Sequence, residues 1–414
     1  MLLVDGGGIY CEDSSPTIIG CIIIDNTANS DGGGGMYFSS SDPIITNCTI
    51  ADNTADFGGG IACEDSSSPK IENCTITGNT ADFGGGIYCP SSSPTITNCT
   101  ITYNEAIDSG GGINCSSAST STIKSCTITG NTATGAGGGI HCYSSSPTIS
   151  NCVISSNGAG TRGGGIACRS GSSPKIENCI ISSNTANKGG GIARRGGASS
   201  PTITNCTIAD NEAGDSGGGI HCQGSGSLTV TNCILYFDSP EEIGLIDSDD
   251  PDVTHSDVQG GWPGEGNIDC DPQFVDDYHL GNCSCCIGAG IMTEDVPLYD
   301  FEGDPRPNPD GSNPDIGADE NPLGEPNTGV IKGHVTDALT VEPIQWAFVI
   351  AINADTKERY SDFTDENGYY EIPVPPATYW VICIKKGYKA VIRRVEVPCG
   401  ETIIVDFELI PKPD

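Results

Sequence analysis

The residues that could do chemistry recur at fixed distances from a repeated glycine triplet. The second residue after each triplet is aromatic, polar or alanine, and an aspartate often stands two residues before it. Aromatic rings beside carboxylates suit the stacking of sugar rings and the binding of Ca²⁺. This pattern gives eight candidate ligand-contacting residues, which are Tyr10, Tyr37, Asp82, Tyr88, Asp108, Asn114, His141 and His221.

A solvated sheet face with acidic turns would carry the same residues without any ligand, and catalysis makes stricter demands. A polysaccharide lyase needs a basic residue beside Ca²⁺-binding aspartates, and the basic patch of the repeats is Arg162, Arg169, Arg194 and Arg195. A glycoside hydrolase needs two carboxylates at a defined separation. The aspartates instead recur in a regular column, and none is singled out by its context.

We therefore predict no catalytic residue, because an active site needs unlike residues to converge and these repeats stay uniform. A structural or adhesion role is favoured, with polysaccharide or another cell-surface component as the partner and Ca²⁺ as the cation that the aspartates would suit. The alternative is a polysaccharide lyase or glycoside hydrolase that acts on acidic polysaccharide at the same face.

The element that must position these residues is a coil of short strands. The glycine triplets end 25 to 28 residues apart, from Gly8 to Gly219. Each repeat contains three strand-like pieces, such as residues 87–89, 94–96 and 99–101, in which isoleucine and cysteine share one face. One such coil cannot bury its apolar face, but stacked coils can. The sequence thus predicts an all-β chain that begins with a parallel β-helix of about nine coils, residues 1–240.

The columns of the repeat have separate structural roles. Isoleucine and cysteine should fill the interior, and two asparagine columns should form corners, because asparagine tolerates the left-handed conformation and stacked amides can hydrogen-bond along a column. The inward columns hold sixteen of the 22 cysteines. These cysteines are either small buried hydrophobes or disulfides between stacked coils, since a coil spacing of about 4.8 Å permits a bridge.

Charge excludes several classes of partner. Lys and Arg total 18 against 54 Asp and Glu, a net charge of −36, which repels the phosphates of nucleic acid. No run of eighteen apolar residues is present to span a membrane. The chain starts inside a repeat, as "MLLVDGGGIYC", so we expect a signal segment upstream and a secreted or cell-surface location. Nothing in the sequence indicates an oligomeric state.

Beyond the repeats we expect two further parts. Residues 241–326 are acidic and irregular and would form a cap and a linker, because the end of a β-helix exposes strand edges. Cysteines 270, 283, 285 and 286 suit disulfides better than a zinc site. An oxygen-rich loop offers a weak Ca²⁺ site made of Asn308, Asp310, Asn313 and Asp315. Residues 327–414 alternate polar and apolar side chains, which predicts a small β-sandwich.

Three segments resemble known families. The repeat "FGGGIYCPSSSPTITNCTITYN" resembles the right-handed parallel β-helix repeats of bacterial surface proteins, and its "GGGI…N" pattern resembles the polymorphic outer membrane protein repeat. The stretch from Asp271 to Glu320, with "DPQFV" and "IGA", is similar to the closing segment of choice-of-anchor Q proteins. Residues 329–410, with "DENGYY" and "KKGY", are similar to carboxypeptidase regulatory-like domains. These resemblances imply a bacterial extracellular protein whose last domain is a transthyretin-like, non-catalytic spacer or contact module.

Overall fold

The structure is a computed structural model that describes residues 6–29, 32–276 and 278–413. Across these ranges the regular structure consists of strands, and no helix has the length and hydropathy to cross a membrane. The chain divides into two compact units. The first contains Met1–His279 and Gly288–Gly324, and the second contains Leu280–Ile287 and Glu325–Asp414.

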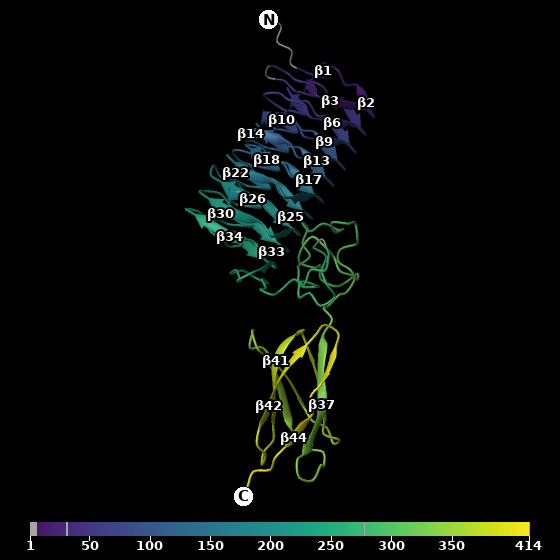
Figure 1. The fold of residues 1–414 in the computed structure, drawn as a ribbon, viewed down its shortest axis with the longest axis vertical. Helices are drawn as coiled ribbons and strands as arrows, with labels where there is room; N and C mark the ends of the chain where they lie inside the picture. Colours follow the sequence, from purple (N-terminus) through teal and green to yellow (C-terminus); the bar gives the residue numbers. More distant parts are fainter. Residues whose placement is uncertain (1–5, 30–31, 277, 414) are drawn as a thin grey trace. The chain divides into compact units, whose positions relative to one another are not determined.

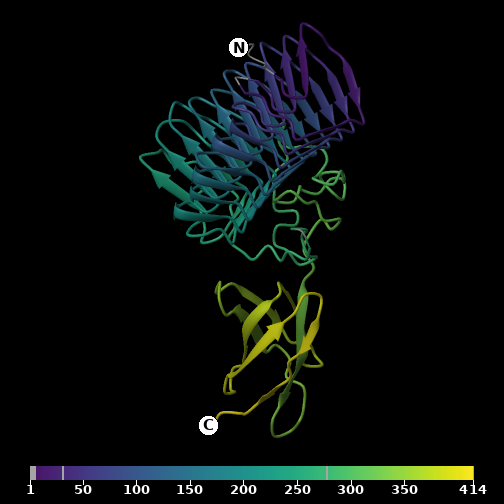
Figure 2. The same cartoon turned by 45° about the horizontal axis from the view of Figure 1, so that its top comes forward.

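The first unit is a parallel β-helix whose coils are stacked strand on strand (Figures 1 and 2). In the described residues, three of its sheets hold ten strands each. The first sheet is formed by β1 (Ile9–Glu12), β4 (Met36–Ser39), β7 (Ile61–Glu64), β11 (Ile87–Pro90), β15 (Ile113–Ser116), β19 (Ile140–Tyr143), β23 (Ile166–Arg169), β27 (Ile192–Arg195), β31 (Ile220–Gln223) and β34 (Ile243–Ile246).

The other two long sheets complete the predicted three-strand coil. The second sheet is formed by β2 (Thr17–Ile19), β5 (Ile44–Thr46), β8 (Lys70–Glu72), β12 (Thr95–Thr97), β16 (Thr122–Lys124), β20 (Thr148–Ser150), β24 (Lys175–Glu177), β28 (Thr202–Thr204), β32 (Thr229–Thr231) and β35 (Asp252–Thr254). The third is formed by β3 (Ile22–Ile24), β6 (Thr49–Ala51), β9 (Thr75–Thr77), β13 (Thr100–Thr102), β17 (Thr127–Thr129), β21 (Val153–Ser155), β25 (Ile180–Ser182), β29 (Thr207–Ala209), β33 (Ile234–Tyr236) and β36 (Asp257–Val258). The parallel ladder thus continues beyond residue 240.

A fourth sheet was not expected from the sequence, which predicted three strand-like pieces in each repeat. It is formed by β10 (Thr80–Phe83), β14 (Glu105–Ser109), β18 (Thr132–Ala133), β22 (Gly158–Arg162), β26 (Thr185–Lys188) and β30 (Glu212–Ser216). The chain then turns back at Gly84, where φ is +66° and a Cβ would lie 2.5 Å from the Ile87 carbonyl oxygen. The ends of these strands therefore lie against the outer side of the first sheet.

The interior is filled as the repeat predicts. In-register pairs such as Ile87 with Ile113 and Cys89 with Cys115 repeat along the first sheet, and these side chains are fully buried. The asparagine column that contains Asn104 and Asn131 forms a continuous ladder. Each Oδ1 accepts from the backbone N–H and the side-chain amide of the preceding coil, as Asn131 does from Asn104 at 3.0 and 2.9 Å. The ladder joins buried amides along the β-helix and fixes the register of its coils.

The sixteen cysteines of the two inward columns are free thiols, and cysteines 270, 283, 285 and 399 are disulfide-bonded. The thiols of the column that runs from Cys21 to Cys233 donate to backbone carbonyls, as Cys99 does to Thr97 at 3.3 Å. Burial raises the pKa of Cys115 to about 11, which disfavours the reactive thiolate.

Thiol titration with a colorimetric disulfide reagent should therefore find 18 free thiols in the unreduced, denatured protein. The native protein should react slowly, because nearly all of these thiols are buried. A count near zero after denaturation would show that the columns are bridged. The reduced, denatured protein, with all 22 thiols available, is the calibration.

The segment of residues 288–324 lies along the flank of the β-helix, whereas the sequence predicted an end cap. Side-chain amides of the other asparagine column, which contains Asn151 and Asn178, hold the segment there. Asn178 Nδ2 donates to the Tyr299 carbonyl at 2.6 Å, and Asn151 Nδ2 donates to the Asp300 carbonyl at 3.0 Å. The buried Arg306 guanidinium pairs with Glu320 at 2.8 Å. At the end of the β-helix, Trp262 packs against the core instead. The side-chain amides of these corner asparagines therefore fix the position of residues 288–324 on the β-helix.

The second unit is a β-sandwich, as predicted. One sheet contains β40 (Tyr369–Val374), β37 (Gly329–Asp337), β43 (Thr402–Ile404) and β44 (Phe407–Leu409). The other has the order β39 (Arg359–Phe363), β38 (Phe348–Asn353), β41 (Ala377–Ile384) and β42 (Val391–Val397). A disulfide between Cys283 and Cys399 ties residues 280–287 to this unit.

Candidate functional site

The outer face of the first sheet contains a groove of about 320 Å³. Four of the predicted candidates line it together, which are Tyr88, Asp108, Asn114 and His141. The seven other lining residues were not among the predicted ligand candidates, and they include Phe57, Phe83, Tyr143 and Arg169. Two signals in the sequence could have found them. The phenylalanines precede glycine triplets in "ADFGGG", and residues 143 and 169 alternate onto the outer face directly after a cysteine.

Aromatic rings make the walls of the groove. The rings of Phe57 and Phe83 stack with centroids 5.7 Å apart, and Phe57 also contacts Tyr88 at 5.0 Å. On β19, the rings of His141 and Tyr143 lie 6.2 Å apart. Phe83 ends a strand of the fourth sheet and Tyr88 belongs to the first sheet, so the turn at Gly84 brings these two rings to the same groove.

Two buried polar side chains form the floor. Asn114 is 2% exposed and His141 is 5% exposed. The Asn114 amide donates to the Ser109 carbonyl at 3.0 Å and lies 3.4 Å from His141 Nδ1. Among the described residues, the Oδ1 atom of Asn114 and the Nε2 atom of His141 have no hydrogen-bond partner. Because buried polar atoms are normally paired, these two atoms leave hydrogen-bonding capacity beneath the groove that the described residues do not use.

The electrostatics of the floor keep the histidine neutral. Burial lowers the pKa of His141 to about 4, and the charge of Arg169 lowers it further while Asp108 opposes the shift. With Nδ1 facing the Asn114 amide, Nε2 carries the proton and can donate it in a hydrogen bond. The floor therefore holds one unused donor, His141 Nε2, and one unused acceptor, Asn114 Oδ1.

The candidates on the first strand of each coil point away from the core, as strand alternation requires, but most of them are buried. Tyr10 is 45% exposed, but Tyr37, Asn114, His141 and His221 are all below 9%. The cause is the fourth sheet, whose strand ends cover this column; Ser216 of β30, for example, lies 3.2 Å from His221 Nδ1. These side chains do point away from the core, but residues of the fourth sheet occupy the space outside them.

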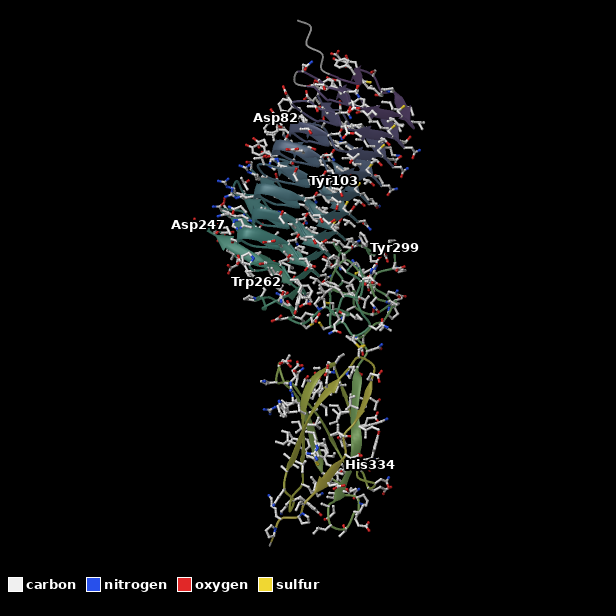
Figure 3. The ribbon with its side chains drawn as sticks, viewed as in Figure 1. Asp82, Tyr103, Asp247, Trp262, Tyr299 and His334 are labelled. Atoms are coloured by element: carbon white, nitrogen blue, oxygen red, sulfur yellow. A yellow bond between two sulfur atoms is a disulfide. The ribbon has the colours of Figure 1, made fainter. Side chains whose placement is uncertain are left out.

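The remaining candidates lie outside the groove. Tyr10 and Tyr37 stack at 5.4 Å on the first two strands of the sheet, and their hydroxyls donate to Glu12 and Glu64. Asp82 is exposed and lies at the edge of the β-helix where Figure 1 labels β10 and β14 (Figure 3).

His221 lies four coils beyond Asn114, in a basic region. Burial lowers its pKa to about 4, and the charges of Lys188 and Arg162 add to this effect. In the sequence, Arg194 belongs to one basic patch with Arg162, Arg169 and Arg195. Its side chain instead occupies the inward cysteine column, is 1% exposed, and donates to the Ser225 carbonyl at 2.9 Å.

The lining residues of the groove can stack, donate and accept, but they include a single carboxylate, that of Asp108. Hydrolysis of a glycosidic bond by the usual route requires two. The arrangement is therefore suited to holding a ring with hydroxyl groups.

The four predicted Ca²⁺ ligands differ in their surroundings. Asp315 is buried, and its two oxygens accept from the backbone N–H groups of Gly288 and Asn321 at 2.6 and 2.7 Å. Burial and the nearby Glu320 raise the pKa of Asp315 to about 8. Asp310 and Asn313 are exposed, and the Asn308 backbone N–H donates to Glu320. The Ca²⁺ site stays a prediction.

No curated protein matches the chain. Among solved structures, the Bacillus anthracis TIE protein matches with 22% identity and a TM-score of 0.18. That match covers 21% of this chain and 17% of the other. A carboxypeptidase regulatory-like domain matches residues 330–410.

The family described as a right handed beta helix region matches residues 4–147 and 138–261, more than half of the chain. Its extent agrees with the strands of the three long sheets, which run from Ile9 to Val258. The chain belongs to the right-handed β-helix family and carries a carboxypeptidase regulatory-like domain after the β-helix.

Proposed function

We propose that this protein is an extracellular structural protein that binds polysaccharide in the groove on the first sheet. The observation that carries the proposal is the pairing of aromatic walls with two buried polar atoms that lack partners among the described residues. Sugar rings stack on aromatic faces, and their hydroxyls both donate and accept hydrogen bonds. Binding without turnover is favoured by the single carboxylate among the lining residues.

A secreted or cell-surface location fits the same proposal. Four cysteines outside the inward columns are disulfide-bonded, and such bonds persist in oxidising surroundings. The free thiols of the repeats are protected by burial, so they are compatible with the same environment. The β-helix would then present the groove, and the carboxypeptidase regulatory-like domain would act as a spacer or contact module.

A glycan array followed by calorimetric titration tests the groove. Replacing Tyr88 and Tyr143 with alanine should weaken binding of any glycan captured by the wild type about 10-fold or more, since each ring supplies on the order of 1 kcal/mol of stacking. Tyr103→Ala is the matched control, because Tyr103 is 70% exposed and lies outside the residues that line the groove (Figure 3).

Two outcomes would change the proposal. If no glycan binds the wild type, or if the double variant binds as the wild type does, the groove is not a polysaccharide site. If incubation with acidic polysaccharide and Ca²⁺ releases reducing ends or unsaturated uronides, and Asp108→Asn abolishes that release, the protein is an enzyme acting at the same face.

A further inference from the structure

Three arginines, Arg162, Arg169 and Arg195, cluster at one end of the groove, which Arg169 also lines. Arg169 of β23 and Arg195 of β27 are in register on adjacent strands, so their side chains leave the same face about 4.8 Å apart. Arg162 ends β22, and its Nη2 donates to Gln223 of β31 at 3.0 Å. To reach β31 this side chain must cross β27, where Ala193 is the small outward residue.

These guanidinium groups have no carboxylate partner among the ion pairs of the described residues. The hydrogen bond from Arg162 to Gln223 goes to a neutral amide, and the buried Nε atom of Arg162 has no partner in the same part of the chain. Burial, followed by the charges of Arg195 and Arg169, lowers the pKa of Arg162. In a chain with 54 acidic residues, uncompensated arginines are a specific local feature. Such a cluster attracts anions and offers forked donors to them.

The cluster is continuous with the groove. Arg169 lines the groove and also lies close enough to Arg162 to lower its pKa. From Tyr88 on β11 to Arg195 on β27 there are four strand intervals, or about 19 Å along the β-helix. A chain bound along this axis would stack its rings over β11 to β19 and then pass the arginines.

We propose that Arg162, Arg169 and Arg195 form an anion site that extends the groove and takes the carboxylate or sulfate groups of a bound polysaccharide. This inference rests on the proposed polysaccharide binding and adds the charge of the ligand. Unlike the stacking interactions, the anion contacts should weaken as salt screens them.

The test compares charged polymers with neutral counterparts on the full chain. Polygalacturonate is paired with its fully methyl-esterified form, and dextran sulfate with dextran. The wild type should bind an anionic member about 10-fold more tightly than its neutral counterpart at low salt, and the pair that shows this preference identifies carboxylate or sulfate. The double variant Arg169→Gln, Arg195→Gln should lose this preference but keep neutral binding.

The variant is chosen to fold, because no hydrogen bond or ion pair of the described structure uses either of these two guanidiniums. The double variant Lys124→Gln, Arg359→Gln removes the same charge from exposed sites elsewhere and should keep the preference. An arginine variant that keeps the wild-type preference overturns the anion site.

A separate readout applies if no polymer binds, in which case the proposed function itself fails. Inorganic sulfate should then raise the thermal unfolding temperature of the wild type more than that of the arginine variant, because a ligand of the folded state stabilises it. Equal shifts in the two proteins would overturn the anion site as well.

Discussion

Replacing Asn131 with alanine should lower the free energy of unfolding of the β-helix by about 3–5 kcal/mol. The Oδ1 atom of Asn131 accepts from both the backbone and the side-chain amide of Asn104, and its Nδ2 donates to the Ile101 carbonyl at 2.9 Å. All of these groups are buried, so the substitution leaves two donors and one acceptor without partners. Each unpaired group costs about 1–3 kcal/mol of stability. Because Asn131 belongs to a central coil, fraying at an end cannot relieve the loss.

Denaturant unfolding followed by far-ultraviolet circular dichroism measures this effect. Asn187→Ala is the matched control, since Asn187 is exposed on β26 and should change stability by no more than about 0.5 kcal/mol. A loss below about 1 kcal/mol for Asn131→Ala would mean that the ladder does not carry the stability assigned to it.

Replacing Asp238 with asparagine should stabilise the protein at pH 7.5 by about 1–2 kcal/mol. Asp238 takes the place of asparagine at the end of the ladder, where its Oδ1 accepts from the backbone and side-chain amides of Asn211 at 2.7 and 2.9 Å. Its Oδ2 and the Glu242 Oε2 are buried without hydrogen-bond partners among the described residues. An asparagine would keep the acceptor, remove the repulsion between two buried carboxylates and add a donor for Glu242.

The pH dependence gives the sign of the effect. Burial raises the pKa of Glu242 from its usual 4.5 to about 7, and burial together with Glu242 raises the pKa of Asp238. The folded state therefore binds more protons than the unfolded state in this range, and stability falls as pH rises from about 4.5 to about 7. A pKa that is higher by one in the folded state than in the unfolded state corresponds to about 1.4 kcal/mol of lost stability, before allowance for solvent screening.

Chemical denaturation at a series of pH values tests the pair. Asp238→Asn should flatten the decline between pH 4.5 and 7, whereas Asp247→Asn, which removes an exposed carboxylate near the same end of the β-helix, should leave it unchanged (Figure 3). If the wild type keeps its full stability across this pH range, or if Asp238→Asn is less stable than the wild type at pH 7.5, the Asp238 and Glu242 carboxylates do not destabilise the folded state.

The candidate site shows where prediction from the sequence ends. Residues such as Asn114 and His141 could be placed on the outer face because strand alternation is a local rule. The phenylalanine wall of the groove could not be placed from the sequence, because Phe57 and Phe83 stand outside the three predicted strand pieces of each repeat. Whether such a stretch bends outward or folds back depends on one positive φ at Gly84 and on contacts with neighbouring coils.

The sequence by itself determined the β-helix, its Ile and Cys interior, its asparagine corners and the separate β-sandwich. Each of these features follows from a periodicity of strands and turns. Because the coils are nearly identical, the same local conformation recurs in each coil of the stack. Tertiary structure alone decided the groove, the arginine cluster and the course of residues 288–324 along the flank. These features arise between residues from different coils or distant segments, where packing and unpaired polar groups, rather than local pattern, set the lowest free energy.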